Sequence, residues 1–395
     1  MSVRSDVVII GAGAAGLSLA ERLATSGSSL SVRLIEAPPG PVRPAPRTWC
    51  FWEDGAGRYD EAVTAAWNRL RVRGPGGRLI DAGTGSVRYK MIRSTDFEAA
   101  VARRLAGRPG STRTEATVEA VEGTADGADV LVRTPEGRAR TLSARWVFDS
   151  RPLGSLPRAR TTLLQHFRGW FVRTPRPAFD PGSVELMDFR TPQPDRGLAF
   201  TYVLPTSSAT ALVEYTQFSS SVLPSEEYDR ALRSHLHTVL GIRDFEIEAR
   251  EEGVIPMTDA VFARQSGGSV FRIGAAGGAT RPSTGYTFTA IQRQTTAITA
   301  ALLAGRRPVP PAPHSRRSHA MDAVLLHALA SGHLDGAAFF TRLFSRVPTE
   351  RLLRFLDGAT SLYEDLSIGL NSPVLPLLRS AASLPSRPLL PSPTP

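Results

Sequence analysis

Short apolar runs and a small-residue stretch alternate along the N-terminal part of the chain. Residues 7–10 and 32–35 are mostly aliphatic, and an alanine-rich stretch lies between them at 14–24. Apolar runs of this length are typical of buried strands, whereas the longer middle stretch has the apolar spacing of a helix. We therefore predict a strand, a glycine turn, a helix and a second strand, which is how an α/β domain begins.

The pattern changes several times farther along the chain. Between 116 and 148 polar and apolar positions alternate and turn signals interrupt them, which predicts antiparallel strands. Residues 156–224 are rich in aromatic and β-branched side chains and indicate a separate sheet, after which 225–240 returns to helical spacing. A compact apolar run at 270–273 and a long helical stretch at 285–303 predict a second strand, loop and helix.

The composition is that of a globular protein without disulfides or structural metal sites. Hydrophobic residues make up 42% and charged residues 21% of the 395 positions, so the chain is expected to fold. Cys50 is the only cysteine, which excludes an internal disulfide and a cysteine-based zinc cage and fits a reducing compartment. The seven histidines are scattered and show no HExxH spacing, so we expect no metal.

The net charge of +10 comes almost entirely from arginine, because Lys90 is the only lysine. No lysine-rich run or groove-reading module accompanies this charge, so we expect no nucleic-acid partner and interpret most of the arginines as a solvated surface. Attraction to anionic lipid headgroups is a second interpretation. No uninterrupted apolar run reaches the ~18 residues that a spanning helix requires, which indicates a protein that is soluble or lies on a membrane.

The run GAGAAG at 11–16 follows the first predicted strand and opens the helix, the context in which this pattern is a dinucleotide-binding fingerprint. Gly11 permits the tight turn, Gly13 lets the backbone approach a pyrophosphate, and Gly16 lets helix and strand pack closely. Glu36, at the end of the second strand, is placed to accept hydrogen bonds from a ribose without a 2′-phosphate. The alternative is an ordinary glycine turn between a strand and a helix.

A second glycine run, GAAGG at 274–278, lies between the late strand and the late helix. It resembles the closing FAD motif of glutathione-reductase-type flavoproteins, in which backbone N–H groups contact the pyrophosphate and the helix start faces the flavin. Many of those proteins carry an aspartate that holds the ribitol, and Ala275 stands at that position here. A helix starting near Gly285 would direct its positive end at the flavin and favour an anionic reduced form. A purely structural glycine loop is the alternative.

Five further segments carry a resemblance to a known family: RTWCFW at 47–52, VFDSRP at 147–152, YVLP at 202–205, LVEYT at 212–216 and RPSTGYT at 281–287. Together they resemble the bacterial lycopene cyclases. Their order and spacing match that family from position 6 to about 376, and match it better than flavin hydroxylases or geranylgeranyl reductases, which share its architecture. The resemblance implies an FAD enzyme that closes the ends of linear lycopene into β-ionone rings, giving γ-carotene or β-carotene with no net consumption of electrons.

Acid-initiated ring closure needs a proton donor for a terminal alkene but neither a metal nor a nucleophile. Glu214 is our candidate, because it lies in an otherwise apolar strand at 211–215, where burial would favour the neutral acid. By resemblance it occupies the first position of the cyclases' acidic motif, whereas Tyr215 stands at the second acidic position. A strand glutamate that faces water or pairs with an arginine is the alternative.

The cofactor and substrate residues are predicted as two groups. We expect the adenosine and pyrophosphate to be held by Gly11, Gly13, Gly16 and Glu36, and the rest of FAD by Gly274, Thr284, Gly285, Tyr286 and Thr287. NAD(P)H or a partner protein would reduce the flavin, and aromatic faces would stabilise the carbocation by about 0.5–2 kcal/mol each. The aromatic candidates, about half of which we expect to line a substrate tunnel while the others belong to the core, are Trp49, Phe51, Trp52, Trp170, Tyr202 and Tyr286.

These predictions combine into an α/β architecture. We expect a glutathione-reductase-type FAD-binding Rossmann domain at 1–155 and 268–308, a mixed-sheet substrate domain at 156–267, a helical C-terminal part at 309–380 and a disordered tail at 381–395. Two alternative functions share this scaffold. One is a redox flavoenzyme, a hydroxylase, epoxidase or prenyl reductase acting on a lipophilic polyprenoid, and the other is a non-catalytic carrier.

A forty-carbon hydrocarbon dissolves in a bilayer, so we expect a cytoplasmic protein that is peripheral on the inner face of the cell membrane. Four apolar residues with two basic neighbours indicate either an interfacial helix or an ordinary amphipathic helix that faces the core. These residues are Phe339, Phe340, Leu343 and Phe344, with Arg342 and Arg346.

Overall fold

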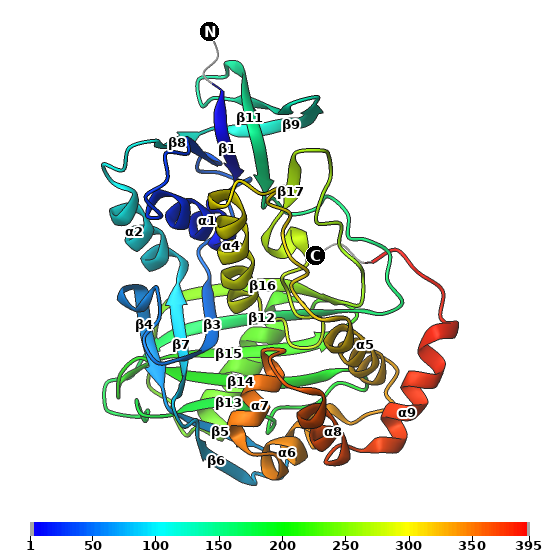
Figure 1. Ribbon diagram of the computed structural model, residues 1–395. Coiled ribbons are helices and arrows are strands. Elements are labelled where there is room, and N and C mark those ends of the chain that lie inside the picture. Colours follow the sequence, from blue (N-terminus) through cyan, green and yellow to red (C-terminus); the bar gives the residue numbers. More distant parts are fainter. Residues whose placement is uncertain (1–3, 393–395) are drawn as a thin grey trace.

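Two large sheets, one above the other in Figure 1, organise the chain, and a small third sheet lies between them. The computed structural model describes residues 4–392. In the first sheet the strand order is β8-β2-β1-β11-β10-β9, with β17 also beside β11. The strands are β1 (Ser5–Ile10), β2 (Val32–Glu36), β8 (Ser111–Glu115), β9 (Thr117–Thr124), β10 (Gly127–Arg133), β11 (Ala139–Asp149) and β17 (Val270–Arg272).

The first sheet is the predicted nucleotide-binding sheet. Its strands β8, β2, β1, β11 and β17 run parallel, and β11, β10 and β9 form an antiparallel meander. Two helices, α1 (Ala14–Ala24) and α4 (Phe288–Leu303), pack against each other beside it (Figure 1). Their small and aliphatic residues share one buried cluster with Val7 and Ile9 of β1, which explains the alanine-rich composition of α1.

The second sheet has the order β16-β12-β15-β14-β13-β5-β6 and is antiparallel except where β13 runs parallel to β5. Residues 69–83 were expected in the nucleotide-binding domain, but the structure places them in this sheet as β5 and β6. The alternation of arginine with Leu70 and Val72 predicts a strand but does not say which sheet it joins. The strands are β5 (Arg69–Arg73), β6 (Leu79–Gly83), β12 (Thr162–Arg173), β13 (Val184–Asp188), β14 (Leu198–Pro205), β15 (Thr210–Ser219) and β16 (Glu246–Thr258).

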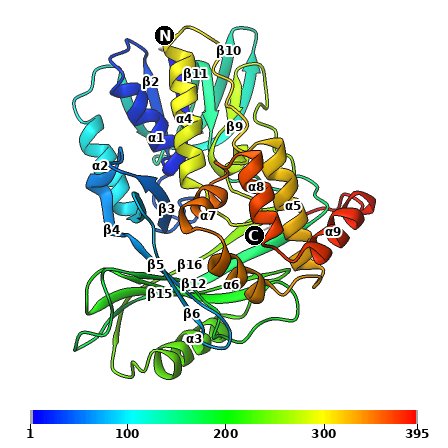
Figure 2. The same ribbon diagram turned by 60° about the horizontal axis from the view of Figure 1, so that its bottom comes forward.

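Strand alternation gives the second sheet two different faces. One face packs on α3 (Ser225–Ser234), which lies below the sheet in Figure 2 and continues as a π-helical turn to Val239. On β15 the residues Val213 and Tyr215 point to this face, whereas Leu212 and Phe218 point to the opposite one. Glu214 has the same parity as Leu212 and therefore lies on the face that meets the rest of the molecule.

The third sheet connects the other two. It consists of β3 (Thr48–Asp54), β7 (Val87–Arg93) and β4 (Val63–Trp67), in that order, and α2 (Ser94–Leu105) follows β7 directly. Successive residues of β3 point to opposite faces and pack in different clusters. Phe51 packs in the cluster that α1 and α4 form with the first sheet, and Trp52 packs in the cluster above the second sheet.

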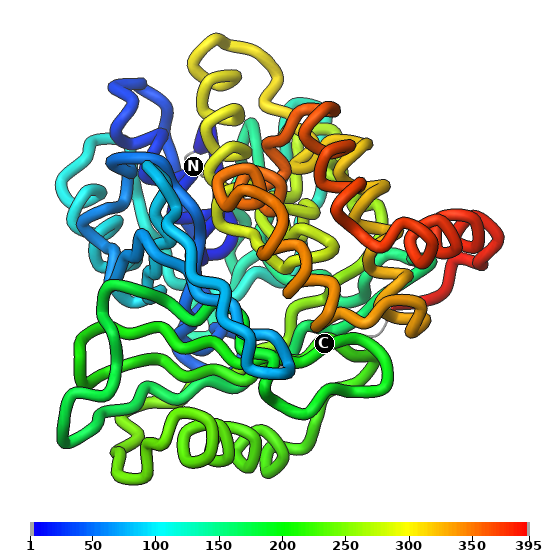
Figure 3. Tube along the Cα trace, turned by 90° about the horizontal axis from the view of Figure 1, so that it is seen from below, coloured from blue at the N-terminus to red at the C-terminus, as the bar shows by residue number. Residues whose placement is uncertain are grey.

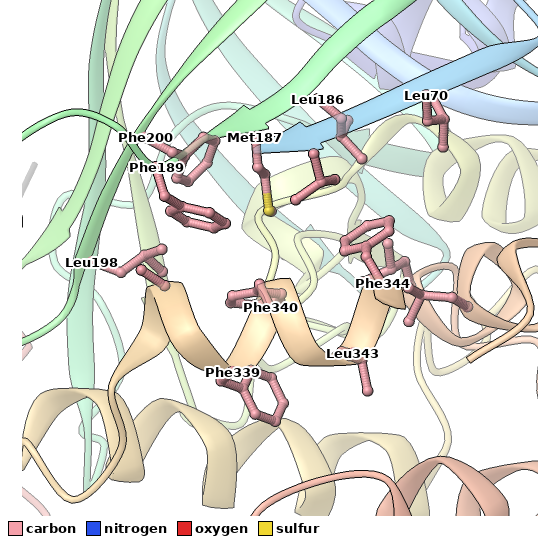
Figure 4. Close-up of a cluster of buried hydrophobic side chains, with 14 of the residues drawn as sticks. Leu70, Leu186, Met187, Phe189, Leu198, Phe200, Phe339, Phe340, Leu343 and Phe344 are labelled. Carbon is pink, nitrogen blue, oxygen red and sulfur yellow. The ribbon is translucent and has the colours of Figure 1, made fainter. Parts of the chain in front are cut away.

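The C-terminal part is helical, as expected, but α6 faces the core. Figure 4 shows its Phe340 and Phe344 directed at apolar residues of the second sheet and Phe339 on the opposite side of the helix, and all three side chains are buried in one apolar cluster. The interfacial interpretation of this stretch is therefore wrong, because its apolar face already has a partner. The helices are α5 (Arg316–Ala330), α6 (Gly336–Arg346), α7 (Thr349–Leu356), α8 (Leu362–Leu370) and α9 (Val374–Ser383).

The end of the chain differs from the expected disordered tail at 381–395. Helix α9 extends through Ser383, and Leu390 exchanges two backbone hydrogen bonds with Ala159, at 3.0 and 2.8 Å. Residues 393–395 lie outside the described part. Over residues 4–392, no helix has the length and apolar character needed to cross a bilayer, and no three or more His, Cys, Asp or Glu side chains gather as a metal site.

Candidate active site

The first glycine run forms the turn that the fingerprint requires. Gly11 has φ +96°, a left-handed conformation that favours glycine, and a Cβ on Gly16 would lie 1.8 Å from the Gly11 carbonyl oxygen. By contrast, the Cβ position of Gly13 meets nothing within 4 Å. Gly13 caps α1 without a side-chain hydrogen bond, so the first N–H groups of α1 remain available to an anion. This open cradle fits a pyrophosphate.

Glu36 lies at the carboxyl end of β2, where the fingerprint expects the ribose-binding acid. Its side chain is buried, and its carboxylate is held by Arg43, with Nη2 2.7 Å from Oε1, and by Arg113, whose Nε donates to Oε2 at 2.7 Å. The two arginines hold the carboxylate in a fixed orientation.

The second glycine run approaches the first. A Cβ on Gly274, which has φ +64°, would lie 2.9 Å from the Cβ of Ala15 in α1. Gly285 has φ +73°, so α4 cannot begin there and starts instead at Phe288, with Thr287 as its N-cap. Thr284 Oγ1 is buried and has no hydrogen-bond partner within residues 4–392. The cradle at Gly13 and this unpaired hydroxyl fit an extended dinucleotide such as FAD.

Two carboxyl groups meet at the centre of the second sheet. Strand β12 pairs with β15 on one side and β16 on the other, and Gly169 is the register partner of both Glu214 and Glu251. Thr216 donates to Glu214 Oε1 at 2.9 Å, and Thr48 of β3 donates to Glu251 Oε2 at 2.7 Å. A hydrogen bond joins the two carboxyl groups.

The surroundings of the two carboxyl groups differ. Burial raises the pKa of Glu214 well above its usual range, and the neighbouring charge of Glu251 raises it further. Burial also raises the pKa of Glu251, but the Thr48 hydroxyl and the positive charges of Arg93 and Arg47 oppose that rise. The surroundings therefore favour the neutral form of Glu214 more strongly than the neutral form of Glu251.

Four aromatic side chains surround this region. Trp52 of β3 stacks on Tyr89 of β7 with ring centroids 4.1 Å apart, and Tyr286 lies edge-on to Trp52 at 6.0 Å. The phenol of Tyr286 is hydrogen-bonded to those of Tyr89 and Tyr202, and Tyr202 is the register partner of Glu214. Burial raises the pKa of the Tyr89 and Tyr202 phenols well above their usual value, so both are neutral.

The other predicted tunnel residues lie elsewhere. Trp49 and Phe51 point to the nucleotide-binding side of β3, where the Phe51 and Phe288 rings stack with centroids 4.4 Å apart. Trp170 is on the α3 face of the second sheet, with the Arg233 guanidinium 5.3 Å from its ring centroid. The predicted residues Trp52, Tyr202 and Tyr286 are thus brought together, and Trp49, Phe51 and Trp170 are not.

Two site residues were missed in the sequence. Tyr89 alternates with Met91 on β7, a pattern that indicates burial but no chemistry. Glu251 lies in the glutamate-rich stretch 246–252, which suggests a solvated strand. The register between β12 and β16 shifts at Val172, which pairs with Ile247, so β16 contains a bulge. Residues four apart on a regular strand share a face, but this bulge places Ile247 and Glu251 on opposite faces.

A family model described as "Lycopene cyclase protein" matches residues 6–382. The chain belongs to the lycopene cyclase family. It is 27% identical to the lycopene beta-cyclase of Paracoccus sp. (strain N81106 / MBIC 01143), over 98% of each chain, and 27% identical to that of Pseudescherichia vulneris, over 94% of this chain and 95% of that one.

Solved structures show that this lycopene cyclase family member has the fold of FAD-dependent flavoproteins. A geranylgeranyl bacteriochlorophyll reductase-like protein from Thermoplasma acidophilum superposes with a TM-score of 0.68 at 15% identity, over 96% of this chain and 99% of that one. p-Nitrophenol 4-monooxygenase from Pseudomonas putida gives 0.60 at 15% identity, over 98% of each chain. The predicted α/β flavoprotein architecture is confirmed.

Proposed function

We propose that this protein is a lycopene beta-cyclase that uses FAD without net oxidation or reduction and converts lycopene to γ-carotene or β-carotene. The observation that carries the proposal is the burial of Glu214, which raises the pKa of its carboxyl group, beside Tyr202 in a region that also holds Trp52, Tyr89 and Tyr286. An uncharged acid facing aromatic rings is suited to making and sheltering a carbocation.

The ring closure balances without another reactant. Glu214 donates its proton to the terminal double bond of lycopene, a neighbouring double bond attacks the tertiary cation, and the new ring returns a proton to Glu214. Trp52, Tyr89 and Tyr202 present aromatic faces to the positive charge and exclude water, which would otherwise trap the cation as an alcohol. When bound, anionic reduced FAD supplies negative charge beside the cation. NAD(P)H is the proposed reductant.

The first test is the product formed in cells that accumulate lycopene. Expression of this chain is expected to give a pigment of unchanged mass with the absorption spectrum of a ring-terminated carotenoid. The alternative is a redox flavoenzyme on the same fold, favoured by the monooxygenase and reductase-like neighbours. A product heavier by one oxygen, or by added hydrogens, would establish that alternative, and unaltered lycopene under reducing conditions would indicate a carrier.

We propose further that the protein meets an anionic bilayer through an apolar face on α8 and α9. Helix α9 projects at the edge of the molecule in Figure 3, and Leu370 and Leu375 are 79% and 80% exposed. No acidic residue follows Asp365, whereas Arg379 is exposed on α9, so the face complements negative headgroups. The exposed apolar side chains of this face are Leu362, Tyr363, Leu366, Leu370, Val374, Leu375 and Leu378.

Vesicle sedimentation tests this face. The FAD-loaded protein is expected to sediment with phosphatidylglycerol-containing vesicles at low salt, and the triple variant Leu366→Glu, Leu370→Glu, Leu375→Glu is expected to stay in the supernatant, because bilayer insertion would bury three carboxylates. Val222→Glu is the control, since Val222 is 50% exposed in the loop before α3. If the triple variant sediments as the wild type does, this face does not bind the membrane. If the wild type and Val222→Glu are dimers and the triple variant is a monomer, the face is an interface between two copies of the chain.

A further inference from the structure

Glu251 is a second carboxyl group beside the proposed proton donor, and it comes from a different strand. A Cβ on Gly169 would come within 3.4 Å of both Glu214 Cβ and Glu251 Cγ, and within 2.7 Å of Leu212 Cδ1. A side chain at position 169 would therefore occupy the space between the two glutamates. The glycine in β12 is what allows two residues on non-adjacent strands to form a hydrogen-bonded pair.

The partners of Glu251 stabilise a carboxylate. Thr48 donates to Oε2, and Arg47 and Arg93 add positive charge nearby. Thr48 and Arg93 are register partners in the β3–β7 pair, so the third sheet delivers both groups to the same end of Glu251. The carboxylate of Glu251 is thus held by an element other than its own strand.

The partners of Glu214 do not stabilise a carboxylate. Its one hydroxyl donor is Thr216, and within residues 4–392 it makes no ion pair with arginine or lysine. The other titratable groups that act on it are Glu251 on β16, the Cys50 thiol on β3 and the Tyr202 phenol on β14. None of these groups carries positive charge.

We propose that Glu251 is the positioning partner of Glu214: its carboxylate, fixed by Thr48, accepts the hydrogen bond of the Glu214 carboxyl group and keeps the shared proton on Glu214 until an alkene accepts it. The inference rests on the proposed function. Tyr215 stands where the cyclases' motif has its second acidic residue, and Glu251 would supply that second carboxyl group from another strand. After proton transfer both carboxylates are ionised and lie near the new cation. The proton released by the ring restores the original pair, so atoms and charge balance.

The pairing predicts a specific change in the pH profile. Ring closure requires protonated Glu214, so activity declines as pH rises through the pKa of that group. Glu251→Gln removes the neighbouring negative charge and offers an amide donor, and both effects lower the pKa of Glu214. The alkaline limb of the kcat profile is expected to move to lower pH by about one to two units, with FAD still bound.

Glu252→Gln is the matched control, because Glu252 is the next residue of β16, points to the other face, pairs with Arg168 at 2.7 Å and has a 68% exposed side chain. Its profile is expected to match that of the wild type. Glu251→Asp keeps the negative charge, so its alkaline limb is expected to lie between those of Glu251→Gln and the wild type. This variant also provides a test if Glu251→Gln folds poorly. An unchanged limb in Glu251→Gln, or equal shifts in Glu251→Gln and Glu252→Gln, would overturn the pairing.

Infrared difference spectroscopy of the FAD-loaded protein tests the pair without substrate. At pH 7 the wild type is expected to show the C=O stretch of one buried protonated carboxyl group, and this band is expected to be absent in Glu214→Gln. As the pH is raised, Glu251→Gln is expected to lose the band at a lower pH than the wild type does. If the band is present but lycopene is never cyclised, the proposed function fails and the pair stands. If cyclisation occurs without the band, the pair fails and the proposed function stands.

Discussion

Replacing Glu214 with glutamine is expected to abolish ring closure, by at least about 10²-fold in kcat, while the purified protein remains yellow. The amide has nearly the same shape as the protonated acid but cannot transfer a proton to an alkene. Measurement of product by chromatography in lycopene-containing vesicles, with flavin absorbance on the same preparation, separates loss of chemistry from loss of cofactor.

Glu248→Gln is the matched control for that substitution, because Glu248 lies in the same sheet, on β16, and pairs with Arg173 at the surface. It is expected to keep wild-type activity. Full activity in Glu214→Gln would remove Glu214 from proton transfer, and equal losses in both variants would point to damage to the sheet.

The stability of the Glu214→Gln variant gives an independent check on the protonation state. The pKa of Glu214 is raised in the folded state, so its favourable contribution is fully present below the unfolded-state pKa and is lost as pH rises through the folded-state value. The variant carries no such group. Its thermal midpoint is therefore expected to rise relative to that of the wild type as pH increases from the unfolded-state pKa of a glutamate toward the raised folded-state value. A constant difference over that range would mean that Glu214 is ionised in the folded protein.

The second large effect is expected at Gly16. In Gly16→Ala the new Cβ would lie 1.8 Å from the Gly11 carbonyl oxygen, so α1 must move away from β1. Overpacking of this kind costs about 1–3 kcal/mol of unfolding free energy, and the displaced turn is expected to lose most of its FAD. Thermal unfolding and the flavin-to-protein absorbance ratio measure the two consequences.

Gly76→Ala is the same chemical change at a position where the added Cβ meets nothing within 4 Å, and it is expected to leave both quantities unchanged. Gly13→Ala separates the two roles: its Cβ has room in the protein, so stability is expected to persist while FAD affinity falls. A Gly16→Ala protein with full flavin and an unchanged midpoint would mean that the turn does not hold the cofactor as described.

The N-terminal strand, glycine turn and helix were predictable because their constraints are local. Gly11 is required by its own left-handed φ and Gly16 by the nearby carbonyl oxygen of Gly11, and the apolar run before them already determines a strand. The prediction failed where the partner is distant in sequence. Residues 69–83 joined the second sheet through a parallel pairing with β13, more than a hundred residues away, which no local pattern encodes.

The candidate active site also contains residues that local sequence predicts and residues that depend on distant partners. Glu214 was predicted from an apolar strand, because a single acid in such a run is visible without knowing its neighbours. Glu251 was not, because it looks like its solvated neighbours until the bulge in β16 and the missing side chain of Gly169 place it beside Glu214. Likewise, Trp49 and Trp52 of one motif separate only when the pleat of β3 assigns them to opposite faces.

Flavin stoichiometry under anaerobic conditions tests the central claim most directly. The FAD-loaded protein is reduced once, excess reductant is removed, and lycopene is added in vesicles while flavin absorbance and product are followed together. The account predicts many ring-closed molecules of unchanged mass for each flavin, with the flavin still reduced at the end. Oxidation of one reduced flavin for each product molecule, or equal turnover by protein stripped of flavin, would contradict it.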